Sequence, residues 1–184
     1  MMLLVMATMM ATAGAWAQKE TPAGIRMESI EVEKNNARYT VFTYKDEDGA
    51  FGYYMSLGGS GQIFSISDGG NTVFSVEDAR ETCLLLGKTV DEAFGTLDTL
   101  MAMFEKEAGT TRVFKGRTTD GGERLAGQNP ATCKVQKRPF GGKRLLFRFT
   151  SGNRQCGVYL TKGVVKQLRW GLKTDVKLHP KMHK

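Results

Sequence analysis

The chain contains only two histidines, His179 and His183, and both lie close to its last residue. A serine or cysteine nucleophile needs an imidazole that a third group holds in a packed site, and an unsupported chain end does not supply one. Pro180 lies between the two histidines and interrupts the helical turn that would bring them onto one face as metal ligands. We therefore expect neither histidine-dependent catalysis nor a metal site.

Complete phosphate-binding loops are also missing. Gly87-Lys88-Thr89 ends like a nucleotide-binding loop, but Thr82 stands where that pattern requires a glycine. A second glycine-rich stretch, residues 58–61, is followed by a strand-like run and not by the helix of a dinucleotide fingerprint. We expect no nucleotide and no other cofactor.

Long hydrophobic runs are absent except at the start of the chain. The run over residues 2–13 is shorter than the roughly 20 residues of a membrane-spanning helix. It leads to Ala15-Trp16-Ala17, the small-x-small pattern that signal peptidase recognises, although no Lys or Arg precedes the run. We predict a signal peptide over residues 1–17 and an exported protein, periplasmic or secreted, with no transmembrane span in its mature chain. The alternative is a buried N-terminal helix.

Cysteine is scarce, with Cys83, Cys133 and Cys156 alone in the chain. An oxidising compartment allows one disulfide among them, and Cys133 with Cys156 is a possible pair because both lie in one strand-rich region. The alternative is three small buried thiols. A chain of this length buries enough surface to be stable without a disulfide.

Short apolar and β-branched runs that end in turn residues predict antiparallel strands on both sides of one helix. The segment 118–130 is polar and rich in glycine and predicts a loop, whereas 75–87 carries the signals of both a helix and a strand. The predicted strands are residues 27–34, 39–45, 51–57, 63–67, 111–115, 132–137, 144–150, 155–161 and 164–173.

The clearest helix begins after Thr89, which with Glu92 forms a capping-box pattern. Apolar residues then recur every three or four positions, and Gly109 is a suitable left-handed stop. The apolar stripe consists of Val90, Ala93, Phe94, Leu97, Leu100, Met101 and Phe104. The predicted fold class is α+β, with antiparallel β-meander segments flanking one long amphipathic helix packed on sheet. We expect a single domain over residues 18–175 and a basic flexible tail over 176–184.

The two halves of the chain carry opposite charge. Residues 18–110 contain 8 Lys and Arg against 16 Asp and Glu, whereas residues 111–184 contain 18 against 3. Strand alternation places several of the positive side chains opposite the apolar face of their strands. The residues predicted to form one basic outer face are Lys134, Arg144, Arg148, Arg169 and Lys173.

These features favour a non-catalytic exported binding module whose basic C-terminal sheet face meets an anionic partner. Candidate partners are lipid headgroups, acidic polysaccharide and acidic protein, and export argues against nucleic acid. One alternative is that acids of the first half neutralise these charges within the fold. Another is an envelope hydrolase with a carboxylate pair, for which the helix offers Asp91, Asp98 and Glu105. A third is a structural or assembly subunit, which predicts a large exposed apolar patch.

Overall fold

The computed structural model describes residues 18–21, 24–34, 37–46, 51–57, 64–68, 71–75, 82–119, 125–151 and 154–183. The predicted signal peptide lies outside the described residues. The described part contains two α-helices and one short 3-10 helix, η1. The strands are β1 (Gln18–Thr21), β2 (Gly24–Lys34), β3 (Ala37–Asp46), β4 (Phe51–Ser56), β5 (Phe64–Asp68), β6 (Asn71–Ser75), β7 (Thr82–Gly87), β8 (Thr111–Thr119), β9 (Leu125–Lys137), β10 (Lys143–Ser151) and β11 (Arg154–Thr161). The helices are α1 (Val90–Met103), α2 (Lys162–Leu178) and η1 (Pro180–His183).

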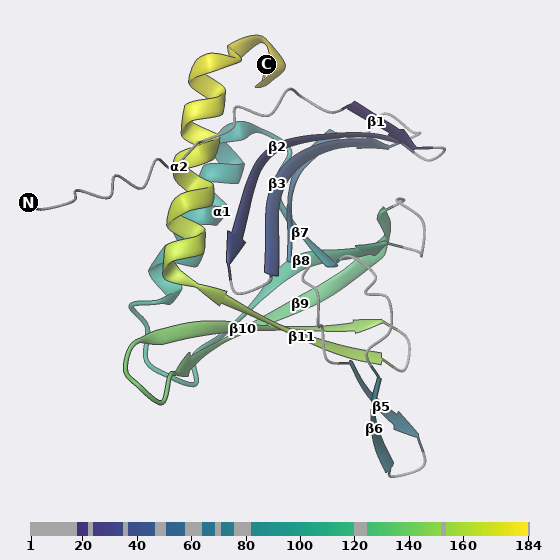
Figure 1. Ribbon diagram of the computed structural model, residues 1–184, viewed down its shortest axis with the longest axis vertical. Helices are drawn as coiled ribbons and strands as arrows, with labels where there is room; N and C mark the ends of the chain where they lie inside the picture. Colours follow the sequence, from purple (N-terminus) through teal and green to yellow (C-terminus); the bar gives the residue numbers. More distant parts are fainter. Residues whose placement is uncertain are drawn as a thin grey trace, which may run out of the picture.

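All of these strands join one antiparallel sheet in the order β1-β2-β3-β4-β7-β8-β9-β10-β11-β5-β6. The β5–β6 hairpin follows β4 in the sequence but lies at the other end of the sheet, where β5 pairs with β11. In Figure 1, β2 and β3 run across the direction of β9 to β11, so the sheet curls and has a concave inner face. An antiparallel sheet combined with helices is thus confirmed.

Most predicted strands are present, with shifted ends. The stretch over 75–87, which carries the signals of both a helix and a strand, contains strand β7, and the predicted loop over 118–130 is occupied in part by the ends of β8 and β9. Residues 118 and 119 pair with 126 and 125 beyond a bulge in the β8–β9 ladder. These polar and glycine-rich residues therefore belong to the strands through backbone pairing.

Helix α1 begins as the capping pattern predicts. The Glu92 amide donates to Thr89 Oγ1 at 3.3 Å, and the Glu92 carboxylate accepts from the Lys88 amide at 2.6 Å. A side chain at Gly87 is excluded, because a Cβ there would lie 2.3 Å from Glu92 Cβ. This close approach explains the Gly-Lys-Thr sequence without any phosphate ligand. Gly109 has φ +98° but lies in the turn that follows the helix, which ends at Met103.

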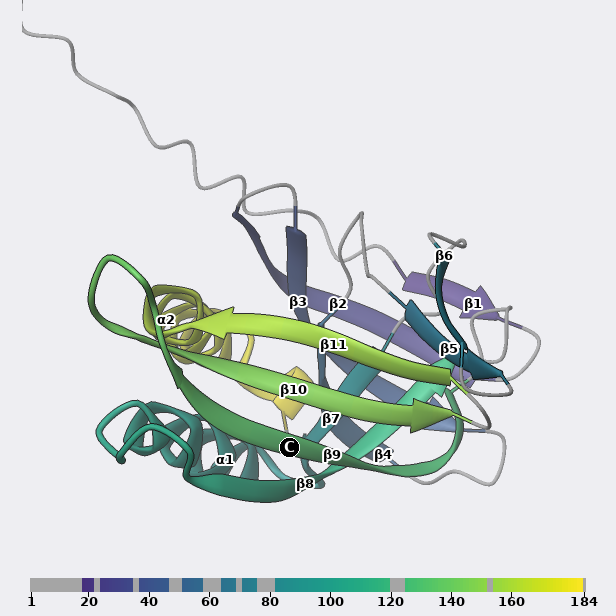
Figure 2. The same cartoon turned by 90° about the horizontal axis from the view of Figure 1, so that it is seen from below.

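The prediction of a strand over residues 164–173 is wrong, because these residues belong to α2. The buried positions Val164, Val165, Leu168 and Leu172 have helical spacing, which the alternation of Leu168, Trp170 and Leu172 obscured. Trp170 is 66% exposed, although the alternation placed it in the core. The described fold therefore contains two α-helices side by side, whereas the sequence predicted a single helix (Figure 2).

Residues 176–183 are also folded, in contrast to the predicted flexible tail. Residues 176–178 continue α2, and η1 follows after His179. The His183 side chain is almost fully buried and its ring stacks on Tyr53, with the two centroids 5.9 Å apart. This contact holds η1 against the sheet.

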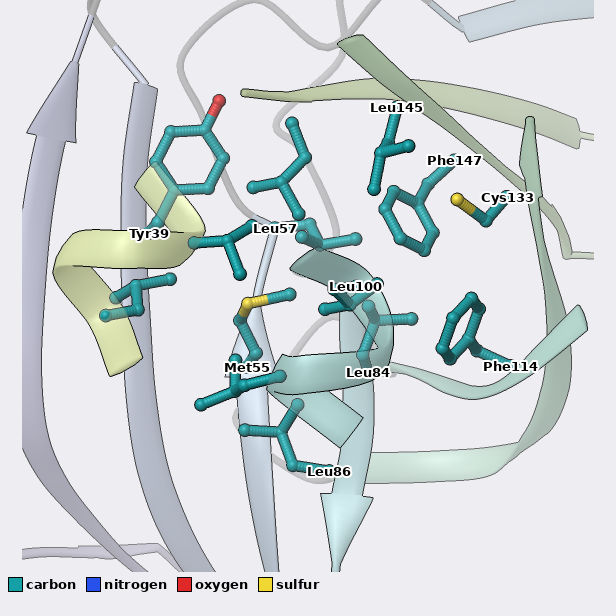
Figure 3. Packing of buried hydrophobic residues seen from close by; sticks show 14 of the residues in the cluster. Tyr39, Met55, Leu57, Leu84, Leu86, Leu100, Phe114, Cys133, Leu145 and Phe147 are labelled. Atoms are coloured by element: carbon teal, nitrogen blue, oxygen red, sulfur yellow. The ribbon is translucent and has the colours of Figure 1, made fainter. Parts of the chain in front are cut away.

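The core lies between the concave face of the sheet and the two helices. Figure 3 shows Leu84 and Leu86 of β7, Leu100 of α1 and Phe147 of β10 converging there. Among the residues expected to anchor the fold, Leu97, Leu100 and Phe104 are buried, and Phe94 is partly buried against the same cluster. A smaller cluster covers the opposite face of β3, β4 and β7 and consists of Phe42, Tyr44, Tyr54 and Cys83, with Leu85 packed against it.

Candidate functional site

Three of the five predicted binding residues come from neighbouring strands on the outer face of the sheet. Cys133, Phe147 and their neighbours of the same parity point into the core, so Lys134 of β9 and Arg144 and Arg148 of β10 point outward. Lys134 pairs with Leu146, which lies between the two arginines along β10. Diagonal neighbours of this kind have Cβ atoms roughly 7–8 Å apart. Lys134 and Arg148 are exposed, and Arg144 is half-buried.

Tyr159 of β11 belongs to the same face. It is 44% exposed, and the Arg144 guanidinium lies 3.7 Å from the centre of its ring. Arg144 Nε also donates to Gln136 Oε1 at 3.3 Å. A cation stacked on an aromatic ring is held in one orientation and keeps N–H groups for a further acceptor.

Lys115 of β8 extends this group of cations, although it was not among the residues predicted to form the basic outer face. Lys115 pairs with Pro130 of β9 and is exposed. The next pair of the same parity joins Val113 to Thr132. Phe114, the residue before Lys115, points into the core, so Lys115 points to the outer face. No aspartate or glutamate occurs in β8, β9, β10 or β11.

Arg169 and Lys173 lie elsewhere, on α2. Arg169 is paired with Asp98 of α1, with Nε 2.5 Å from Oδ1 and Nη2 3.1 Å from Oδ2. This pairing lowers the pKa of Asp98, chiefly through the hydrogen bond from Arg169, and raises that of Arg169. Lys173 is exposed. The structure therefore divides the predicted basic set between the sheet and the helix.

Two of the three spaced carboxylates, Asp98 in α1 and Glu105 just beyond its end, contact cations of α2. Glu105 accepts from Lys162 at 2.5 Å, as Asp98 does from Arg169, and the hydrogen bond from Lys162 lowers the Glu105 pKa. Asp91 lies in the first turn, where a negative charge is favourable at a helix N-terminus. Their seven-residue spacing thus places two of these acids beside cations of α2.

A buried polar chain links the end of the molecule to the sheet, and sequence reasoning missed it. His183 Nε2 lies 2.8 Å from Asp175 Oδ2, and His183 Nδ1 lies 2.9 Å from the Tyr53 hydroxyl. A carboxylate only accepts, so the ring donates from Nε2 to Asp175, and Nδ1 shares a hydrogen bond with the Tyr53 hydroxyl. Burial, and secondarily the Asp175 charge, raises the Tyr53 pKa. These three side chains are largely buried, which suits a role in fastening η1.

Cys133 carries a free thiol in the core, and burial raises its pKa to about 12. Residues Cys133 and Cys156 belong to β9 and β11, and β10 lies between these strands. Two strand spacings amount to roughly 9.5 Å, whereas the Cα atoms of a disulfide lie within about 7 Å of each other. A bridge between them would require β10 to move aside.

In the described ranges, no three His, Cys, Asp or Glu side chains lie together as a metal site would require. Neither α1 nor α2, nor any other described helix, is both long and apolar enough to cross a bilayer. No family model, curated protein or solved structure matches the chain.

Proposed function

We propose that this protein is an exported, non-catalytic binding module that holds an anionic partner on the outer face of β8 to β11. The observation that carries the proposal is the outward cluster of Lys115, Lys134, Arg144 and Arg148 on strands that contain no acid. Within the described part of the chain, no carboxylate pairs with these four side chains. Export rests on the pattern of residues 1–17.

The chemistry of this face fits a partner with repeated negative charges. Lys134 is a hydrated point charge, whereas Arg144 is stacked on Tyr159 and offers a planar donor group. Anionic lipid headgroups, acidic polysaccharide and acidic protein share the acceptor oxygens that such groups bind. The test therefore offers one probe of each kind.

A charge-neutralising double variant tests the proposal. Lys134→Gln with Arg148→Gln removes two cations of the outer face, and Lys166→Gln with Lys173→Gln removes two exposed cations of α2 as the matched control. The probes are phosphatidylglycerol vesicles, polygalacturonate and polyglutamate, with binding measured by sedimentation at low and at about 150 mM salt. Each Lys or Arg near an anionic surface contributes about 1 kcal/mol, so the first variant should weaken binding roughly tenfold to thirtyfold.

The α2 variant should bind within about twofold of the unmodified protein, because its cations lie off the outer face. The probe that the unmodified protein binds best identifies the class of partner. Equal binding by the two double variants, or binding that does not weaken between low and moderate salt, would refute the proposal.

A further inference from the structure

A groove of about 510 Å³ opens where β7, β8 and α1 meet. Its walls come from the end of β7, the first half of β8 and one side of α1. The α1 side carries small residues, and a Cβ added at Gly95 would meet nothing within 4 Å. The groove is therefore open to solvent along the helix.

The groove exists because β7 and β8 separate soon after they pair. Their ladder joins Thr82, Cys83 and Leu84 to Thr118, Arg117 and Gly116 and extends no further within the continuous described stretch 82–119. Beyond it, β7 continues to pair with β4, and β8 continues to pair with β9. Residues 111–115 of β8 thus have a ladder on one side only and present a free strand edge to the groove.

On the β7 side of the groove, a backbone group forms a hydrogen bond with a side chain instead of with a neighbouring strand. The Leu86 carbonyl, on β7, accepts a hydrogen bond from Thr96 Oγ1 of α1 at 2.6 Å. On the β8 side, Val113 is 64% exposed and lines the groove. An unpaired edge of this kind is a ready template for a further strand.

Charge around the groove is predominantly positive. Lys88, Arg112 and Lys115 contribute three cations, and Glu92 is the acid among the lining residues. The Glu92 carboxylate already accepts the hydrogen bond from the Lys88 amide. The surroundings of the free edge therefore favour a ligand with negative side chains.

We propose that this groove binds an extended acidic peptide, which adds a strand to the edge of β8. Main-chain hydrogen bonds to residues 111–115 supply affinity, and the three cations select acidic side chains. This is a second site, which shares Lys115 with the outer face but depends on the gap between β7 and β8 and not on Lys134 or Arg148.

Gly95→Leu tests the groove directly. The new side chain enters open space, and leucine is a better helix former than glycine, so the fold should be retained while the groove is filled. Ala102→Leu, at an exposed position of the same helix, is the matched control. The probe is a fluorescent octapeptide of alternating valine and glutamate, titrated by anisotropy. Comparison peptides carry lysine in place of glutamate or N-methyl groups on alternate amides.

The acidic peptide should bind the unmodified protein and the Ala102→Leu variant alike and lose at least tenfold affinity for Gly95→Leu. N-methylation should abolish binding, because it removes the strand hydrogen bonds, and the lysine peptide should bind at least tenfold more weakly. The outer-face variant Lys134→Gln/Arg148→Gln should retain the peptide, which separates this site from the proposed function. Unchanged binding to Gly95→Leu, equal binding of the N-methylated peptide, or loss only in the outer-face variant would overturn the inference.

Discussion

Tyr53 illustrates how a single side chain fastens two distant parts of the chain. The Tyr53 hydroxyl shares a hydrogen bond with His183, and the Tyr53 ring is buried in the core beside the helices. A buried acceptor that loses its donor retains the full cost of its desolvation. The bond therefore contributes more to stability than an exposed hydrogen bond would.

Removing that hydroxyl should destabilise the protein. Tyr53→Phe removes the hydroxyl that shares a hydrogen bond with His183 Nδ1, and we expect the free energy of unfolding to fall by about 1 kcal/mol. Tyr159→Phe also removes one phenol oxygen but at a half-exposed ring, so it should change stability by less than about 0.5 kcal/mol. Urea titration monitored by circular dichroism measures both, and equal losses would contradict the role given to the buried chain.

At the scale of elements, α2 packs so closely on the sheet at Gly171 that there is no room for a side chain there. A Cβ at Gly171 would lie 2.6 Å from Ile30 Cγ2 of β2, whereas Gly95 of α1 faces open space. Glycine thus has different effects in the two helices: at Gly171 it allows the contact with β2, whereas at Gly95 it leaves the groove open and weakens the helix.

The two glycines make a matched pair of predictions. Gly95→Ala should raise the unfolding free energy by about 0.5–1 kcal/mol through helix propensity alone. Gly171→Ala gains the same propensity, but overpacking of about 1–3 kcal/mol outweighs it, and the protein should lose about 1 kcal/mol. Thermal and urea unfolding of both variants provide the measurement. Equal stabilisation by the two substitutions would show that β2 yields to α2 without strain.

The same comparison shows how far local patterns determine elements. Helix α1 was predictable because its cap and its three- and four-residue spacing agree. In α2 the buried set begins with two adjacent valines, its cap residue Thr161 makes no side-chain capping bond, and Leu168, Trp170 and Leu172 mimic strand alternation. Strand parity correctly gave the direction of Lys134, Arg144 and Arg148. The groove was beyond prediction, since it depends on where two strands part and not on the pattern of either.

For the molecule as a whole, Cys133 reports on the integrity of the packed layer between sheet and helices. Its thiolate, the reactive form, is suppressed by a pKa of about 12 and by full burial. Reaction with a thiol reagent therefore requires that the layer open.

In a Cys83→Ala/Cys156→Ala background, Cys133 should react with a thiol reagent at pH 8 at least three orders of magnitude more slowly than an exposed thiol. The rate should rise with urea in parallel with the loss of circular dichroism, because both follow unfolding. Rapid labelling of a fully folded sample would mean that the layer opens locally.

The remote pairing of β5 with β11 has a consequence for how the chain is made. A ribosome releases the β5–β6 hairpin well before β11, which comes after β10, so the hairpin waits without its partner while the intervening strands are synthesised. Contacts between segments so distant in sequence form slowly and leave edges exposed in the meantime. Because β5 and β11 are so far apart in the sequence, we expect this edge of the sheet to close after the local hairpins have formed.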